Sequence, residues 1–499
     1  MKLKQLKFVA RSRRAYLIDT KYERDVKRVM SFSVPGARFS PAFREGRWDG
    51  RINMMQNHAA SIGLLRAPTI RKELEEKGYK VRLIKWTDRP SYIKREGFTE
   101  TVEKYSYQND CVKAMLKAIP FGGGLVLSAT ASGKTKIAAQ FASWVNSPIL
   151  FVVDQIDLLY QSAKEIEDWL KLPVGVVGNS KFLPSDRVTI GTIQTLFKHR
   201  KDTLFRRWLK TIKIVIIDEI HVQMARSNFS VVNLIRPEAV FGLTATLQLK
   251  KKDVRMKAYS ICGPVIFEFS VKEGMDKNVL TRGVAVQVSV ASDLIEEMQP
   301  LPKGTPMNIR MRVQSDNYDK AVVHNVCTNK AIADFVSYAV GKGYYCVVLV
   351  ERLKHLHKLA KMFKLRGVDA ELCYGAVGTE ERKAVRGRFE KGDGRLILAN
   401  VVFKKGINLK RVDLIVDCAQ RSNKNDVLQK LGRGLRLHAD KSGLMYFDMV
   451  TTPAMVKQSK KRLSALKAAK VTVVKTDYMS AKALLQLGEG TLTKALKGN

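Results

Sequence analysis

Residues 122–145 read GGGLVLSATASGKTKIAAQFASWV and join three patterns in one stretch. The apolar run at 122–129 follows a glycine turn and is typical of a short buried strand. Residues 134–145 carry apolar side chains at the four-residue spacing of a helix face. The Gly-Lys-Thr triplet at 133–135 therefore lies at a helix N-terminus, where backbone N–H groups and the helix dipole favour phosphate.

This loop departs from the common pattern G-x-x-x-x-G-K-[ST]. Ser128 stands at the first glycine position, and Ala131 stands where a second glycine is frequent. We expect both to be tolerated because small size is the constraint at these positions. In such a loop Lys134 contacts the β- and γ-phosphates and the Thr135 hydroxyl ligates Mg²⁺.

A second stretch, IKIVIIDEIHVQ at 212–223, strengthens this interpretation. Its β-branched run predicts a buried parallel strand that ends in Asp218 and Glu219, at the sheet edge where α/β proteins bind ligands. Asp218 can hold Mg²⁺ through water, and Glu219 can orient and deprotonate an attacking water. The alternative is an acidic turn after a core strand.

Further apolar strands alternate with helical patterns along the chain, at 147–161, 187–197, 239–247, 344–367, 394–409, 411–418 and 426–450. Several of these strands end in polar residues, which places those side chains at one edge of a sheet. The alternation predicts an α/β fold with a doubly wound parallel sheet in each half of the chain.

The segment QKLGRGLR at 429–436 provides two arginines in the second half. Arg433 and Arg436 are three apart on one predicted helical face, and Gln429 precedes Arg433 by four residues. A solvated basic helix end is the alternative. Since this half has no phosphate loop of its own, the pattern indicates that the arginines contact a nucleotide held by another domain.

Together these motifs resemble those of superfamily 2 helicases. They are, in order, YSYQ (105–108), SATASGKT (128–135), FVVDQIDLLYQ (151–161), TIQTL (192–196), DEIH (218–221), TAT (244–246), FKKGINL (403–409) and QKLGRGLR (429–436). The resemblance covers roughly residues 101 to 455 and implies two RecA-like lobes that close on ATP, with nucleic acid crossing both.

The resemblance also implies roles by position. ATP would be bound by Gln108, Ser132, Gly133, Lys134 and Thr135, with Tyr105 or Tyr107 near the adenine, and Mg²⁺ would be held by Thr135 and Asp218. Catalysis would involve Lys134, Glu219, Gln429, Arg433 and Arg436. Thr244, Thr246 and Gly406 would couple ATP to lobe movement. Thr192, Gln194 and Thr195 would contact nucleic acid. Asn400 and Asn408 stand where this motif region usually carries Thr and Asp. This difference leaves open how the ATP state and the contact with the nucleic-acid strand are linked there.

The first hundred residues lie outside these motifs. The stretch SPAFREGRWDGRINMM at 40–55 resembles the N-terminal accessory domain of phage UvsW-type helicases, which remodel branched DNA. Residues 62–84 predict a helix followed by a strand. Trp48 is either the core aromatic of a small α+β domain or a base-stacking residue that contacts nucleic acid.

The charge indicates a polyanionic partner. The net charge is +41, with +13 in residues 1–100 and +8 in residues 451–499, so the excess is spread along the chain. Such a surface gains affinity for nucleic acid by counterion release. The alternatives are a merely basic soluble protein and one attracted to an acidic membrane, but no run of about 18 apolar residues and no anchor helix appears. The six scattered cysteines fit a reducing cytoplasm, the host's if the protein is phage-encoded.

We therefore expect an accessory DNA-binding domain (1–100), an ATP-binding lobe (101–275), a connecting segment (276–320), a second RecA-like lobe (321–455) and a basic tail of one helix and a mobile end (456–499). The predicted function is an ATP- and Mg²⁺-dependent DNA helicase or translocase for forks and Holliday junctions in replication, recombination and repair, favoured as a monomer that tracks a single strand. The alternatives are an RNA helicase, the motor subunit of a restriction-type complex, and a non-catalytic binding module.

Overall fold

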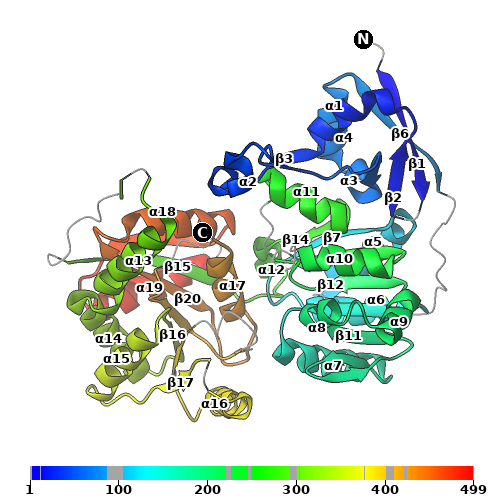
Figure 1. The fold of residues 1–499 in the computed structure, drawn as a ribbon. Coiled ribbons are helices and arrows are strands. Elements are labelled where there is room, and N and C mark those ends of the chain that lie inside the picture. The colour runs from blue at the N-terminus through cyan, green and yellow to red at the C-terminus, as the bar shows by residue number, and fades with distance from the viewer. Residues whose placement is uncertain are drawn as a thin grey trace. The chain divides into compact units, whose positions relative to one another are not determined.

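The computed structural model describes residues 3–11, 13–86, 105–220, 226–245, 249–292, 301–302, 304–375, 377–400, 409–420 and 424–497. The chain divides into two compact units, one of residues 1–129 with 133–269 and the other of residues 270–499 with 130–132 (Figure 1). Each unit is built around a parallel sheet, which confirms the predicted α/β class.

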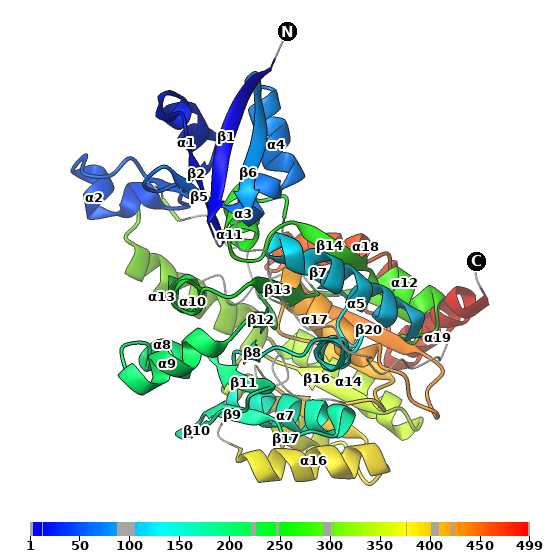
Figure 2. The same cartoon turned by 90° about the vertical axis from the view of Figure 1, so that its right-hand side faces the viewer.

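The first unit begins with a small α+β module. Its main sheet has the order β5-β2-β1-β6, and β1 runs parallel to β6 beside it (Figure 2). Leu6, Phe8 and Ala10 of β1 alternate with exposed or partly exposed residues, which buries one face of the sheet. The elements are β1 (Lys4–Arg11), β2 (Arg14–Leu17), α1 (Glu23–Val29), β3 (Ser31–Ser33), α2 (Pro41–Arg44), β4 (Arg51–Asn53), β5 (Ala59–Ser61), α3 (Ile62–Arg66), α4 (Pro68–Glu75) and β6 (Tyr79–Trp86).

The rest of the first unit is a lobe whose sheet has the order β10-β9-β11-β8-β12-β13-β7-β14, parallel except for β10. Its strands are β7 (Gly123–Ser128), β8 (Ile149–Val153), β9 (Gly175–Gly178), β10 (Lys181–Leu183), β11 (Val188–Thr192), β12 (Ile214–Ile217), β13 (Ala239–Thr244) and β14 (Val265–Phe269). Its helices are α5 (Ser106–Ala118), α6 (Lys134–Trp144), α7 (Ile156–Leu170), α8 (Ile193–Lys198), α9 (Thr203–Thr211), α10 (Arg226–Ile235) and α11 (Lys252–Ile261).

Strand β12 shows why this sheet is covered on both faces. Ile214 and Ile216 belong to one hydrophobic cluster, with residues of α5, α6 and α7. Val215 and Ile217 belong to another, with residues of α8, α9, α10 and α11. Because successive side chains of a strand point to opposite faces, a continuous apolar run is what a strand between two helical layers requires.

The second unit has a fully parallel sheet in the order β17-β18-β16-β19-β20-β15-β21. Its strands are β15 (Gly283–Ala291), β16 (Cys346–Leu349), β17 (Glu371–Cys373), β18 (Leu396–Ala399), β19 (Leu414–Asp417), β20 (Leu444–Thr452) and β21 (Thr472–Asp477). Its helices are α12 (Val271–Asp276), α13 (Met307–Tyr318), α14 (Val326–Gly341), α15 (Leu353–Lys364), α16 (Thr379–Lys391), α17 (Lys424–Gly434), α18 (Val456–Ala468) and α19 (Ala481–Lys497).

Two predicted boundaries are wrong in this unit. The segment 276–320 is not only a connection, because β15 lies inside the sheet between β20 and β21. The segment 456–499 is not a basic tail, because β21 pairs with β15 and α19 buries Leu484, Leu485 and Leu492 in the main hydrophobic cluster. The apolar residues of this segment are interspersed with lysines, so the sequence pattern does not indicate that they are buried.

The N-terminal module is docked on the lobe with the eight-stranded sheet by specific contacts. Arg13 donates to the carbonyl oxygens of Gly122, at 3.1 Å, and of Ile261. The Ser61 hydroxyl donates to the carbonyl oxygen of Ser260 at 2.8 Å. A single hydrophobic cluster includes residues from both parts. The described residues 3–11 and 13–86 are therefore integral to the first unit, and deletion of this module would expose apolar surface of the lobe.

Candidate functional site

The loop between β7 and α6 has the backbone of a phosphate cradle. β7 ends at Ser128 and α6 begins at Lys134. The intervening chain turns through left-handed conformations at Ala131, with φ 68°, and at Gly133, with φ 76°. The first N–H groups of α6 have no partner within the helix, as an anion site at a helix N-terminus requires. At Ala131 a side chain costs roughly 1–2 kcal/mol in this conformation, so size is not the only constraint there.

Gln108 lies against this loop. It is buried in the first turn of α5, and a Cβ atom added to Gly133 would lie only 2.7 Å from its Nε2 atom. The same Nε2 donates to the Tyr107 hydroxyl at 3.2 Å. The Tyr107 ring in turn stacks on Phe269, with 3.8 Å between ring centroids. Gly133 is thus required twice, for its positive φ and for the close approach of Gln108.

The two predicted carboxylates meet the loop at the carboxyl end of β12. The Nζ atom of Lys134 lies 3.6 Å from Oε1 of Glu219. The Thr244 hydroxyl, at the end of β13, donates to Oε2 of Glu219 at 3.3 Å. Three motifs that are far apart in the sequence therefore converge on Glu219, because their parallel strands end at the same sheet edge.

Asp218 is the electrostatically unusual member of the group. Burial and the neighbouring Glu219 carboxylate raise the pKa of Asp218 to about 7, although Lys134 opposes the shift. Carboxylate oxygens and a hydroxyl such as that of Thr135, in the first turn of α6, are donors that Mg²⁺ prefers, so this set fits a divalent cation.

Lys136 and Trp169 are neighbours of the loop that the sequence did not indicate. The Nζ atom of Lys136 lies 4.6 Å from the ring centroid of Tyr105 and 4.2 Å from that of Trp169. Burial lowers the pKa of Lys136. The second lysine of the GKTK run is a visible signal, but nothing in the sequence pairs it with a tryptophan on α7.

The residues predicted to touch nucleic acid lie at the end of β11 and the start of α8. The Thr192 hydroxyl is buried and donates to Oγ1 of Thr195 at 3.0 Å. Gln194 is exposed, and its Nε2 donates to the carbonyl oxygen of Asp154 at 3.0 Å. Of the three, Gln194 is the most accessible to a ligand; the contact with nucleic acid stays a prediction.

The predicted arginine helix is α17 of the second unit. Gln429 and Arg433 lie one turn apart on it, as expected, and both are partly exposed. Arg436 is not on the helix, since α17 ends at Gly434. A Cβ atom at Gly434 would lie 2.6 Å from Ile415 and 2.7 Å from Leu444, so the helix end packs closely on the sheet. The shared helical face predicted for Arg436 is therefore wrong.

Three residues singled out in the sequence have no described position. Thr246 and Gly406, predicted to couple ATP to movement, lie outside the described residues, as does Asn408.

Trp48 is not a core residue. It is partly exposed, its indole N–H donates to the carbonyl oxygen of Arg51 at 2.8 Å, and the described core of the module does not include it. The core interpretation is wrong, because the indole is partly exposed and the neighbouring residues 43–47 are exposed as well. Its contact with a base stays a prediction.

Trp48→Ala is accordingly expected to reduce the free energy of unfolding by only about 1 kcal/mol, mainly through the lost hydrogen bond. A core tryptophan would cost about 3–5 kcal/mol. If the indole stacks on a base, affinity for a DNA junction falls by about 1–3 kcal/mol. Thermal melting and junction binding of the same variant measure both effects. Phe8→Ala, at a fully buried position, is the control for core loss.

Family models match most of the motif-bearing chain. The model of the type III restriction enzyme res subunit matches residues 101–249, and that of the helicase conserved C-terminal domain matches residues 328–438. The model of the N-terminal region of the DNA helicase UvsW matches residues 6–84.

Similar proteins include the ATP-dependent DNA helicase uvsW of Enterobacteria phage T4, 23% identical over 465 residues, which is 87% of this chain and 88% of that protein. The DNA 3'-5' translocase XPB2 of Sulfurisphaera tokodaii is 23% identical over 69% of this chain and 81% of its own length. Among solved structures, S. cerevisiae Dbp5 bound to RNA and ADP BeF3 aligns with a TM-score of 0.52 at 14% identity, covering 78% of this chain and 97% of Dbp5, which supports the tandem-lobe fold.

The chain is therefore a superfamily 2 helicase, as its motifs indicated. Its N-terminal module adds a more particular assignment, because that module carries the UvsW N-terminal pattern in front of the two lobes. The chain is similar to T4 UvsW over 87% of its length and matches the UvsW N-terminal model at residues 6–84. None of the helices that the structure describes is long and apolar enough to cross a membrane.

Proposed function

We propose that the protein is an ATP-dependent DNA helicase or translocase that remodels branched DNA, such as forks and four-way junctions, in replication, recombination and repair. One observation carries the proposal: a single unit holds both the convergent Lys134, Glu219 and Thr244 and a docked module of the UvsW N-terminal family. The T4 relative of similar length is named an ATP-dependent DNA helicase.

The residues of the first unit supply the chemistry in this proposal. The N–H groups at the start of α6 and the Lys134 ammonium hold the phosphates of ATP. Asp218 and the Thr135 hydroxyl hold Mg²⁺, which when bound neutralises charge on the phosphate oxygens. Glu219 orients the attacking water and accepts its proton. Thr244, hydrogen-bonded to Glu219, moves with the state of that carboxylate.

The remaining roles follow from position. Gln108, beside Gly133, reads the adenine with Tyr105 or Tyr107, and Ser132 and Gly133 line the phosphate loop. Gln429, Arg433 and Arg436 stabilise charge on the transferring phosphoryl group during turnover. Thr192, Gln194 and Thr195 contact the nucleic-acid backbone. Thr246 and Gly406 help to couple ATP to movement.

The substrate is tested by ATP hydrolysis measured without nucleic acid and with single-stranded DNA, linear duplex, forked DNA, a four-way junction and RNA. We expect stimulation by DNA, strongest with the branched forms. Stimulation by RNA alone would contradict the DNA assignment. Equal stimulation by linear duplex and junction would favour a restriction-type motor, which the match to the res subunit model also suggests.

A further inference from the structure

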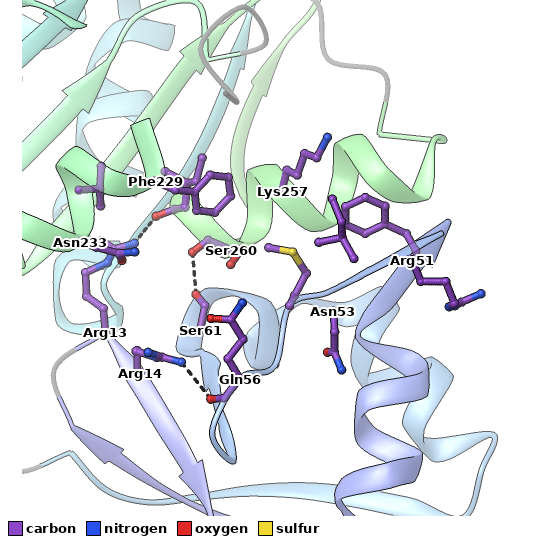
Figure 3. Close-up of a pocket in the computed structure, with 15 residues that line it drawn as sticks. Arg13, Arg14, Arg51, Asn53, Gln56, Ser61, Phe229, Asn233, Lys257 and Ser260 are labelled. Carbon is purple, nitrogen blue, oxygen red and sulfur yellow. Dashed lines mark hydrogen bonds between the residues drawn. The ribbon is translucent and has the colours of Figure 1, made fainter. Parts of the chain in front are cut away.

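A groove lies where the N-terminal module meets helices α10 and α11 of the ATP-binding lobe. It encloses about 910 Å³, and both of its sides belong to the first unit (Figure 3). We call it the junction groove and define it by six of the polar residues that line it: Arg14, Arg51, Asn53, Gln56, Asn233 and Lys257. None of the sequence motifs predicted this feature.

The charge of the junction groove is entirely positive. Arg13, Arg14, Arg51 and Lys257 line it, and no lining residue that the structure describes is acidic. Arg13 is committed to carbonyl oxygens of the lobe and lies at the base of the groove. The other three cations remain accessible, since Arg14 and Arg51 are exposed and Lys257 is partly exposed.

The accessible cations are held in place by neutral partners. Arg14 donates to the carbonyl oxygen of Gln56 at 3.1 Å. Arg51 donates to the Ser31 hydroxyl at 2.8 Å. The Nζ atom of Lys257 lies 5.4 Å from the centroid of the Phe32 ring. Within the described residues none of the three forms an ion pair with a carboxylate, so their charge is available to an external anion.

The other lining groups suit an extended strand with sugars as well as phosphates. Asn53, Gln56 and Asn233 offer amide donors of the kind that contact phosphate oxygens. Ile52 is 39% exposed, and Phe229 also lines the groove, partly exposed. Apolar surface between cations is typical of grooves that follow a nucleic-acid backbone.

The position of the groove relates it to the ATP site. Helix α10 follows β12 along the chain, and Asp218 and Glu219 come directly after the last residue of β12. Helix α11 follows β13, which ends at Thr244. A ligand that contacts Asn233 on α10 and Lys257 on α11 therefore contacts the two helices that come next after the catalytic strands.

We infer that the junction groove binds the sugar-phosphate backbone of one DNA arm through Arg14, Arg51 and Lys257. The inference rests on the proposed function and adds to it a site that holds the substrate away from the motif residues. An arm held there is fixed to the ATP-binding lobe, because the module and the lobe share one core.

The triple variant Arg14→Ala, Arg51→Ala, Lys257→Ala tests the inference. For a synthetic four-way junction we expect affinity to fall roughly ten- to hundred-fold near physiological salt. The slope of log affinity against log salt should lose about 1 per residue removed. ATP hydrolysis without DNA should stay within about two-fold of the unmodified protein, because none of the three contacts the nucleotide site.

The matched control removes the same charge from the far end of the lobe. Lys164→Ala, Lys171→Asn and Lys181→Ala change exposed residues of the α7 and β10 region, with asparagine at 171 because φ is positive there. Junction affinity and salt slope that fall equally in both triple variants would overturn the groove assignment. Loss of ATP binding in the groove variant, with junction binding retained, would overturn it as well.

A single replacement gives an independent readout if the triple variant folds poorly. Gln56→p-benzoylphenylalanine places a photocrosslinker at an exposed lining position, and Lys164→p-benzoylphenylalanine is its control. We expect crosslinking of junction DNA at 56 and not at 164. The opposite pattern would refute the groove. Absence of DNA-stimulated ATP hydrolysis in the unmodified protein would instead refute the proposed function, so the two failures are distinguishable.

Discussion

Lys134→Ala is expected to abolish measurable ATP turnover. Two losses combine, since the ammonium proposed to position the phosphates disappears and the Asp218–Glu219 pair loses a cation that lies 3.6 Å from Glu219. Without that charge the pKa of Asp218, already raised to about 7, should rise further and weaken its hold on a divalent cation. ATP hydrolysis and ATP binding measured on the same preparation separate the two effects.

Glu219→Gln is the companion variant that isolates the chemical step. It keeps the size of the side chain and leaves Asp218 in place, but it removes the group that we propose accepts the proton from water. We expect ATP binding to persist while turnover falls roughly 10²–10⁴-fold. Lys113→Ala, on an exposed position of α5, is the control for loss of a lysine. Near-normal turnover in Lys134→Ala, or failure of ATP binding in Glu219→Gln, would contradict the assignment of the site.

The sequence predicted the elements that form the candidate ATP site because each of them is local. The strand at 214–217 is a continuous apolar run, and Asp218 and Glu219 follow it directly. Parallel strands end at a common edge, so the convergence of Lys134, Glu219 and Thr244 follows from strand order alone. What the sequence did not contain was the conformation of Ala131, since a positive φ at a non-glycine residue is set by the surrounding loop.

The errors arose where structure depends on distant partners. β15 alternates as VAVQVSV, a pattern that predicts a strand, yet its place between β20 and β21 is decided by pairing over long separations. The junction groove is invisible to motif analysis because only docking of the module brings Lys257 of α11 beside Arg14 and Arg51 of the module. Arg436 was misplaced since α17 ends at Gly434, two residues before it, where the spacing had suggested a continuous helix.

The C-terminal segment, interpreted as a basic tail, contributes a buried charge to the second unit. Arg462 of α18 is 1% exposed, and its Nε atom donates to Oδ1 of Asp448 on β20 at 2.8 Å. Gln287 of β15 donates to the other Asp448 oxygen at 2.9 Å. Burial raises the pKa of Asp448 even beside Arg462. The Arg462 and Asp448 charges stabilise each other in the fold, because neither side chain is accessible to water.

Buried polar contacts beside this pair also hold α17, the helix that carries the predicted arginine. Lys430 of α17 contacts both carboxylate oxygens of Asp417, at 2.8 Å and 2.7 Å. The Tyr446 hydroxyl donates to Asp417 at 2.6 Å. Asp417 and Asp448 lie opposite each other in register on paired strands β19 and β20. α17, which carries Gln429 and Arg433, is thereby fixed on the same face of the sheet that α18 covers.

Arg462→Ala is therefore expected to lower the free energy of unfolding of the second unit by about 3–5 kcal/mol, because it leaves the Asp448 carboxylate buried without its counter-charge. For a domain of this size that loss corresponds to a fall in Tm of roughly 6–20 °C. Lys461→Ala, at the adjacent exposed position, should change stability by no more than about 0.5 kcal/mol. Differential scanning calorimetry of both variants compares a buried with a solvated cation on one helix.

A double variant shows whether the cost arises from the orphaned charge or from lost packing. Arg462→Met with Asp448→Leu removes both charges and keeps apolar volume, so it should recover most of the stability lost in Arg462→Ala. If the double variant is as unstable as Arg462→Ala, packing by the guanidinium stem is the cause. If Arg462→Ala instead melts like Lys461→Ala, α18 is not part of the folded core and the segment from 456 onward is a tail after all. The outcome matters for activity because the same layer positions the helix that carries Arg433.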